Sequence, residues 1–396
     1  MKYSAAASAG VVCASCDVGY SLAQSTSTAT RRQVTVGGRR ITTVDVHAHC
    51  AVPAVLDLVK GTPLEVPARR QLEGNLGFPV NAARIADMDK DGIDVQVLSI
   101  NAFWYATDRD LARRMFDVQS EKLAGMCKAI PGRFLGYAPV SLQFPELAAE
   151  QLEYSMKQLG LVGAAIGGSV EGEEIAAPKF DPFWKKAEEL QALIFIHPQT
   201  AAQSTGITKR VQGSGALGNV IGNPLETSLA LAHLIFEGTL DRFPNVKICG
   251  AHGGGFLPSY AARMDHGCSV FPDQCKGPTL KKKPSEYLKQ LYFDSLVFTS
   301  EALRHLVNEH GASQIMIGTD YAVPWVKGPV DHVLNTPGLS DAERIAILEV
   351  APADDRHSHR AQVVRAHVLV AAERQFACRS TRSLAREHRS THGAHP

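Results

Sequence analysis

The chain has 396 residues, of which 45% are hydrophobic and 20% charged, and its formal net charge is +1. This composition is ordinary for a globular protein. The even charge balance shows no excess of basic residues that would favour binding to nucleic acid or to an anionic membrane surface. No apolar run approaches the roughly 18 residues that a membrane-spanning helix requires. The length is sufficient for one barrel of about 250 residues with insertions.

Apolar, strand-like runs recur along the chain, and helix-like stretches separate most of them. The predicted strands are residues 41–47, 92–100, 133–140, 161–167, 192–197, 246–252, 291–298 and 314–320. The predicted helices are residues 83–90, 108–129, 146–159, 183–190, 224–240 and 300–310. Repeated βα units with buried strands predict a closed parallel (β/α)8 barrel, the TIM barrel, rather than an open doubly wound sheet. The chain has no G-x-G-x-x-G or P-loop sequence, so nothing favours a nucleotide site.

The two ends of the chain differ in composition from the middle. Residues 1–31 are rich in alanine and serine, which favours either a disordered leader or a weak secretory signal. Residues 351–396 form an atypical tail that has many arginines and histidines but no lysine. We interpret this tail as a translated alternative frame or as divergence after an indel, with a basic tail for an anionic partner as the other reading. The barrel domain is therefore predicted to span residues 32–350.

The eight cysteines are scattered through the chain. Cys13 and Cys16 form a C-x-x-C sequence, but no second pair accompanies them and no strand–helix context surrounds them, so we interpret the motif as incidental. A reducing, cytoplasmic location is the default expectation. Export is the alternative, if the alanine- and serine-rich N-terminus is a signal.

Four histidines and one aspartate each end a strand-like run. They are His47 and His49 in Val-Asp-Val-His-Ala-His, His197 after Leu-Ile-Phe-Ile, His252 before three glycines, and Asp320 after Ile-Met-Ile-Gly-Thr. Imidazole and carboxylate are ligands that divalent metals such as zinc prefer, and a His-x-His pair on a strand points both rings to one face. A single histidine in such a place is more often structural. The conjunction of all five predicts a metal site at the carboxyl ends of barrel strands, where barrel enzymes build their active sites.

The order of these motifs resembles the amidohydrolase-related family (amidohydrolase 2). The motifs are His47-x-His49, His197-Pro198 and the sequences at 251–255 and 318–321, supported by residues 84–89, 92–97, 284–287 and 293–295. The chain is most similar to the aminocarboxymuconate-semialdehyde decarboxylase group, over about residues 42–348. Resorcylate-type decarboxylases usually open with Glu-x-His instead. The resemblance implies a (β/α)8 barrel and the metal-dependent, non-oxidative decarboxylation of a small unsaturated or aromatic carboxylic acid.

The resemblance also implies roles for the clustered residues. His47, His49, His197 and Asp320 would hold one divalent ion, Zn²⁺ first and Mn²⁺ as the alternative, and would leave one position for water or substrate. His252 would act with Asp320 at the catalytic centre, as the acid and base that activates the water and handles the proton placed on carbon.

Three further residues are predicted to bind the substrate. Arg84 matches a substrate-contacting arginine of the family, and Arg263 matches one that reaches the neighbouring subunit's site, which implies a homodimer. The planar fork of arginine suits a carboxylate. Trp104 is predicted to pack on a planar substrate, with core packing as its alternative. Asp294, at the end of the seventh predicted strand, is expected to be structural.

Two departures from the family pattern leave the substrate open. Gln199 stands where the group commonly has an aromatic residue after His-Pro, and the proline usually found just after the Asp-aromatic pair is shifted to Pro324. The competing function is a hydrolase or hydratase that acts on a small carboxylate or lactone at the same metal site. A non-catalytic binding barrel is disfavoured, because no ligand position is lost.

Overall fold

The structure is a computed structural model that describes residues 30–73, 79–101, 104–199, 210–275, 277, 280–323, 325 and 327–349. Apart from residues 30 and 31, the predicted leader lies outside the described residues, and so does the whole of the predicted tail. The division of the chain into leader, barrel and tail therefore stays a prediction.

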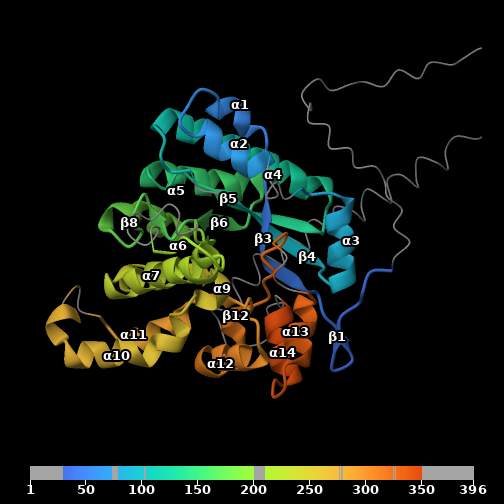
Figure 1. Ribbon diagram of the computed structural model, residues 1–396, viewed down its shortest axis with the longest axis vertical. Coiled ribbons are helices and arrows are strands. Elements are labelled where there is room, and N and C mark those ends of the chain that lie inside the picture. Colours follow the sequence, from blue (N-terminus) through green and yellow to red (C-terminus); the bar gives the residue numbers. More distant parts are fainter. Residues whose placement is uncertain are drawn as a thin grey trace, which may run out of the picture.

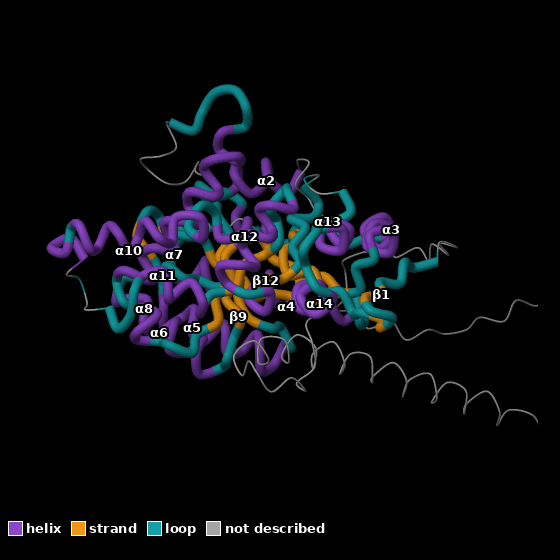
Figure 2. Tube along the Cα trace, turned by 90° about the horizontal axis from the view of Figure 1, so that it is seen from below, coloured by secondary structure: helices purple, strands orange, loops and turns teal. Residues whose placement is uncertain are grey.

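Eight parallel strands form the central sheet, and every one of them overlaps a strand predicted from the sequence. In chain order they are β3 (Val44–Cys50), β4 (Val95–Ile100), β5 (Phe134–Pro139), β6 (Gly163–Ile166), β9 (Leu193–Ile196), β10 (Lys247–Gly250), β11 (Tyr292–Asp294) and β12 (Ile315–Met316). Neighbours in the sheet follow this same order. Their residues are buried, as expected of parallel strands covered on both faces. Figure 2 shows the strands at the centre with helices around them.

Helices follow most strands and cover the outside of the sheet (Figure 1). The helices are α1 (Val55–Val59), α2 (Glu65–Glu73), α3 (Ala82–Asp91), α4 (Arg109–Ala129), α5 (Pro145–Tyr154), α6 (Asp181–Glu189), α7 (Asn223–Phe236), α8 (Thr239–Arg242), α9 (Ala251–Gly254), α10 (Ala261–Val270), α11 (Pro284–Tyr287), α12 (Ser300–His310), α13 (Pro329–Asn335) and α14 (Asp341–Leu348). Side-chain caps explain several starts: Asp108 accepts a hydrogen bond from Leu111 N at α4, and Thr299 from Ala302 N at α12. Gly92, with φ 76°, ends α3 and lets the chain turn into β4.

The sheet closes into a barrel where its last strand meets its first. The amide of Val46 on β3 donates to Ile317 O at 2.9 Å, just after β12, and His49 N donates to Tyr321 O at 2.7 Å. An isolated parallel bridge between Ala48 and Tyr321 continues this pairing. The (β/α)8 prediction is thus confirmed. The line along which β3 and β12 meet, from Asp45 to Tyr321, is called the seam below.

Smaller features were not predicted from the sequence. Two short antiparallel hairpins stand outside the barrel, β1 (Thr35–Val36) with β2 (Arg39–Arg40) and β7 (Ser169–Val170) with β8 (Glu173–Glu174). A disulfide joins Cys268, on α10, to Cys275. Helices α10 and α11 lie at one end of the molecule in both Figures 1 and 2. Within the described ranges, no helix is both long enough and apolar enough to cross a membrane.

Candidate metal centre

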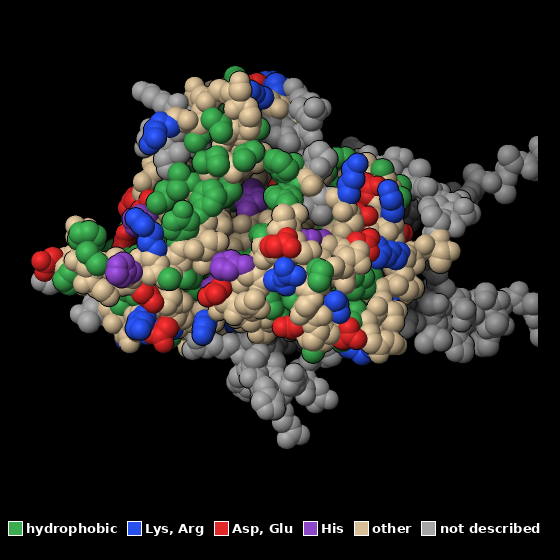
Figure 3. Space-filling view, turned by 60° about the horizontal axis from the view of Figure 1, so that its bottom comes forward, with side chains coloured by type: hydrophobic (Ala, Val, Ile, Leu, Met, Phe, Trp, Pro, Cys, Tyr) green, Lys and Arg blue, Asp and Glu red, His purple; other side chains and the backbone are tan. Residues whose placement is uncertain are grey.

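The histidines and the aspartate singled out from the sequence converge at the carboxyl ends of the barrel strands. His47 and His49 lie on β3. His197, His252 and Asp320 lie in the segments that follow β9, β10 and β12. One ligand atom from each of His47, His197, His252 and Asp320 lies within 4.8 Å of the others. The parallel direction of the strands explains the convergence, because parallel strands all end on the same rim of a barrel. In Figure 3 histidine side chains are visible in a hollow bordered by apolar side chains.

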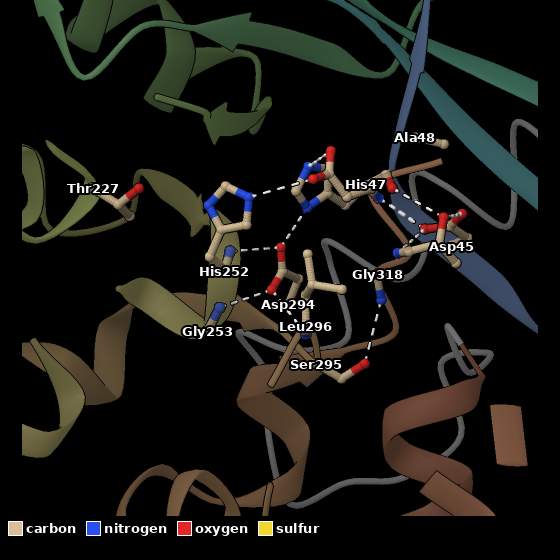
Figure 4. A network of polar contacts seen from close by, with 12 residues as sticks. Asp45, His47, Ala48, Thr227, His252, Gly253, Asp294, Ser295, Leu296 and Gly318 are labelled. Atoms are coloured by element: carbon tan, nitrogen blue, oxygen red, sulfur yellow. Dashed lines mark hydrogen bonds and ion pairs between the residues drawn. The ribbon is translucent and has the colours of Figure 1, made fainter. Parts of the chain in front are cut away.

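His47 lies between two carboxylates, and one of them bonds its Nδ1. Its Nδ1 lies 2.6 Å from Asp294 Oδ2 (Figure 4). Its Nε2 lies 3.2 Å from Asp320 Oδ1. Burial would lower the pKa of His47, but the charges of Asp320 and Asp294 outweigh burial and raise it. Metal-bound histidines typically donate their second ring N–H to a carboxylate or carbonyl, which fixes the tautomer and aims the free nitrogen. The contact with Asp294 supplies that arrangement.

His49 is oriented from outside the cluster by a hydroxyl. Its Nδ1 lies 2.8 Å from Ser99 Oγ on β4, and its Nε2 lies 2.7 Å from Asp320 Oδ1. Burial lowers the pKa of His49, so burial favours the neutral ring that a metal ligand must be. Burial alone would raise the pKa of Asp320, but the imidazoles around it hold that pKa well below its ordinary value.

His197 gives the clearest sign that the residues of the cluster fit a metal ion. It is 4% exposed, and neither of its ring nitrogens has a hydrogen-bond partner. Its ring centroid lies 4.6 Å from that of His49 and 5.0 Å from that of His47. Burial, together with the neighbouring imidazoles, lowers the pKa of His197 well below its ordinary value. A buried, neutral and unpaired imidazole is costly unless something binds it, and neutral imidazoles facing a carboxylate are a divalent-metal donor set.

His252 sits in a tight turn after β10, within the short helix α9. Its Nε2 lies 3.7 Å from Asp320 Oδ2, and its backbone is left-handed with φ 56°. The amides of His252 and Gly253 donate to the two oxygens of Asp294 at 2.9 and 2.8 Å (Figure 4). The glycines after it have positive φ as well, and a Cβ on Gly255 would meet Pro224 O at 2.1 Å. Close packing within the protein therefore explains the glycine run, and approach of a substrate is not needed to explain it.

The predicted substrate-binding residues lie in three different environments. Trp104, just beyond β4, is 5% exposed and belongs to the hydrophobic core. Arg263 is exposed on α10. Arg84, on α3, is fully buried, donates from Nη1 to His49 O at 2.6 Å and stacks 4.7 Å from the ring centroid of Tyr321. Substrate contact by these three residues stays a prediction.

Several polar residues that support the cluster were missed or undervalued in the sequence. Asp294 was expected to be structural, yet it contacts a predicted ligand directly. Asp45, Gln96 and Ser99 are buried polar residues inside apolar strands. The presence of a polar residue inside each predicted buried strand could have indicated them, because a buried polar group requires a hydrogen-bond partner. Which partner each one has is visible only in three dimensions.

Comparison with known proteins places the chain in a family. The model of the amidohydrolase family matches residues 44–354. A 2-amino-3-carboxymuconate-6-semialdehyde decarboxylase of Dictyostelium discoideum is 33% identical over 64% of this chain and 69% of its own length. A gamma-resorcylate decarboxylase of a Polaromonas species is 30% identical over 66% of this chain and 82% of its own.

Solved structures agree with the fold. A 5-carboxyvanillate decarboxylase from Sphingomonas paucimobilis superposes with a TM-score of 0.70 at 24% identity, covering 78% of this chain and 96% of that one. The enzyme of the same name from Novosphingobium aromaticivorans, complexed with manganese and a nitrobenzoic acid, gives 0.69 at 22% identity, over 81% and 97%. The chain therefore belongs to the amidohydrolase family, and it groups there with carboxy-lyases.

Proposed function

We propose that the protein is a metal-dependent, non-oxidative decarboxylase of a small unsaturated or aromatic carboxylic acid. The observation that carries the proposal is the buried donor set, above all the unpaired ring nitrogens of His197 beside Asp320. The two curated relatives described above act on an aminocarboxymuconate semialdehyde and on gamma-resorcylate, which are an unsaturated and an aromatic acid. Their shared chemistry defines the substrate class.

In this proposal His47, His49, His197 and Asp320 hold one divalent ion. A bound divalent ion in such a site supplies Lewis-acid chemistry and lowers the pKa of a water molecule from 15.7 to about 7. Zn²⁺ suits the imidazole-rich donor set. Mn²⁺ is tested beside it because manganese is present in a solved structure of this fold.

His252 is the proposed acid and base. It reaches the cluster from the turn after β10, its side chain is 13% exposed, and its Nδ1 is buried without a hydrogen-bond partner. A proton held on this ring would be delivered to the carbon from which carbon dioxide departs, which typically accelerates such a step about 10²- to 10⁴-fold. Its distance to Asp320 also suits a further metal ligand, so the two roles require a direct test.

The His252→Ala variant separates these roles. As an acid and base, His252 is not needed to hold the ion, so the variant should keep its metal content near that of the wild type while turnover collapses. Loss of metal together with activity would instead make His252 a ligand. A pH–rate profile adds a second readout, because one limb should disappear in the variant.

The reaction class is tested by carbon dioxide release. Purified protein loaded with Zn²⁺ or Mn²⁺ is incubated with a panel of unsaturated and aromatic carboxylic acids. Release of one equivalent of carbon dioxide per acid consumed supports decarboxylation. Ring opening or water addition without carbon dioxide would support the competing hydrolase or hydratase, and wild-type protein that binds no divalent ion would overturn both.

We further propose that the active form is a homodimer in which Arg263 binds the substrate of the neighbouring subunit. The exposure of Arg263 on α10 supports this role, because an exposed side chain is available to a neighbouring subunit. Mixing Arg263→Ala protein with His252→Ala protein is the test, since in a two-fold dimer each subunit would lend Arg263 to the other's site. Activity should reappear in mixed dimers, which would contain one intact site. If mixed dimers form and stay inactive, Arg263 does not act across the interface.

A further inference from the structure

The proposed ligands stand on both sides of the barrel seam. His47 and His49 come from the first strand of the sheet, and Asp320 follows its last strand. The main chain already ties these residues together, because Asp320 N donates to His47 O at 2.8 Å. The contacts that hold the two strands together at the seam therefore also set the distance between the two sides of the metal site.

A buried carboxylate, Asp45, joins the two sides of the seam through its side chain. Its Oδ1 accepts hydrogen bonds from His47 N at 3.0 Å and from Thr319 N at 3.2 Å. Its Oδ2 accepts from Thr319 Oγ1 at 2.6 Å. Asp45 therefore holds the residue before Asp320 and the amide of His47 with the same group.

Arg84 on α3 and Gln96 on β4 extend this network next to β3, the strand that contains His47 and His49. Gln96 Nε2 donates to Asp45 Oδ2 at 2.9 Å, and Gln96 Oε1 accepts from Arg84 Nε at 2.8 Å. Arg84 Nη1 donates to the carbonyl of His49 at 2.6 Å, and its guanidinium stacks on Tyr321, directly after Asp320. Arg84, Gln96 and Asp45 are each at most 1% exposed. The single arginine thus contacts both sides of the seam.

We propose that Arg84 is a positioning residue, which acts through Gln96 and Asp45 and through the carbonyl of His49 to set the spacing of the metal ligands across the seam. This inference rests on the metal site of the proposed function, and it replaces substrate contact as the role of Arg84. The chemistry requires arginine, because its rigid fork donates in two fixed directions while its flat face stacks on an aromatic ring. The buried positive charge is balanced by Asp45, with the amide of Gln96 bridging the two.

Metal affinity is the measurement that separates positioning from substrate contact. We would determine the Kd of the metal-free protein for Mn²⁺ and for Zn²⁺ by competition with a chelating dye, and the absorption spectrum with Co²⁺, which reports ligand geometry. The variants are Arg84→Met, Arg84→Lys and Gln96→Met. Arg133→Met is the matched control, because Arg133 is another largely buried arginine that bonds main-chain carbonyls, but at the opposite end of the barrel.

Arg84→Met and Gln96→Met are expected to raise the metal Kd about tenfold or more, as loss of outer supports of metal ligands commonly does. Arg84→Lys should lie between these variants and the wild type, since an ammonium cannot keep both bonds and the stacking. Arg133→Met should lose stability but keep its metal Kd within about twofold. If Arg84→Met does not fold, Arg84→Lys and Gln96→Met are judged by the same criterion.

An unchanged metal Kd and Co²⁺ spectrum in the Arg84 and Gln96 variants would overturn the inference. If KM for the acid then rises in the Arg84 variants while metal affinity stays intact, Arg84 is a substrate contact. A wild-type protein that binds neither ion is a different failure, because it removes the metal site of the proposed function itself.

Discussion

Replacement of Asp294 by asparagine should weaken metal binding more than it weakens the fold. Asp294 Oδ2 accepts from His47 Nδ1 at 2.6 Å and from His252 N at 2.9 Å. Its Oδ1 accepts from Gly253 N at 2.8 Å and from Leu296 N at 3.1 Å. Asparagine keeps one accepting oxygen and turns the other into an amide donor. The two orientations of this amide have different consequences.

With the amide nitrogen in place of Oδ1, two buried main-chain N–H groups lose their acceptor. With the nitrogen in place of Oδ2, only His252 N loses its acceptor, because His47 can change tautomer and accept at Nδ1. Since each unpaired buried donor costs about 1–3 kcal/mol, the second orientation is favoured by that amount. In this orientation a His47 ring that frees Nε2 for an ion must carry its proton on Nδ1, where that proton would face the N–H of the new amide instead of an acceptor. We expect metal affinity to fall about 10- to 100-fold and the free energy of unfolding by about 1–3 kcal/mol.

Two measurements on the Asp294→Asn variant test this reasoning. The metal Kd comes from chelator competition, and the free energy of unfolding of the metal-free protein comes from urea denaturation. Asp241→Asn is the control, because Asp241 also accepts from a hydroxyl and an amide, those of Tyr287 and Lys281, but lies outside the cluster. An Asp294→Asn variant that loses stability but keeps the wild-type metal Kd would refute the tautomer argument.

Three further predictions concern stability. Burial raises the pKa of Glu226 from 4.5 to about 7, so the folded state binds that proton more tightly, and the free energy of unfolding should fall as pH rises between these values. Urea unfolding of the Glu226→Gln variant should lack this pH dependence, and an unchanged pH dependence would contradict the prediction. Burial lowers the pKa of Lys247 from 10.5 to about 8, so the charged ammonium destabilises the folded state at pH 7. Lys247→Met should therefore raise the melting temperature at pH 7, by an amount that shrinks as pH rises from about 8 to 10.5, and equal melting temperatures at pH 7 would speak against this. The Cys268–Cys275 disulfide spans a sequence separation of 7, so its reduction should lower the free energy of unfolding by about 2 kcal/mol without changing metal affinity, and equal stabilities of the two forms would contradict the estimate.

The barrel and the identity of the clustered residues could be predicted from the sequence because both follow local rules. Each strand is a short buried run, and each proposed ligand lies within such a run or in the segment that follows it. Parallel strands bring all these ends to one rim, so the convergence of His47, His197 and Asp320 required no further information. The resemblance to the amidohydrolase family supplied the order of the motifs.

Partners of the buried polar residues could not be predicted in the same way. Nothing around Arg84 in the sequence indicates that its guanidinium is buried and bonds Gln96 and the carbonyl of His49. Asp294 looked structural because nothing in its local sequence indicates a histidine 247 residues away. Hydrogen bonds between distant segments depend on side-chain direction across the whole sheet, and a single sequence does not contain that direction.

Barrel closure and the proposed metal site depend on the same hydrogen bonds, and this has a thermodynamic consequence. His47 O accepts from Asp320 N across the seam, and Asp45 accepts from both His47 N and Thr319 Oγ1. An ion held by His47 and Asp320 would link the same two strands. Because coupling between two equilibria is reciprocal, closure of the seam must favour the ion by as much as the ion favours closure. Binding of the ion should therefore stabilise the pairing between the first and last strands directly, because His47 and Asp320 stand on the two sides of that pairing.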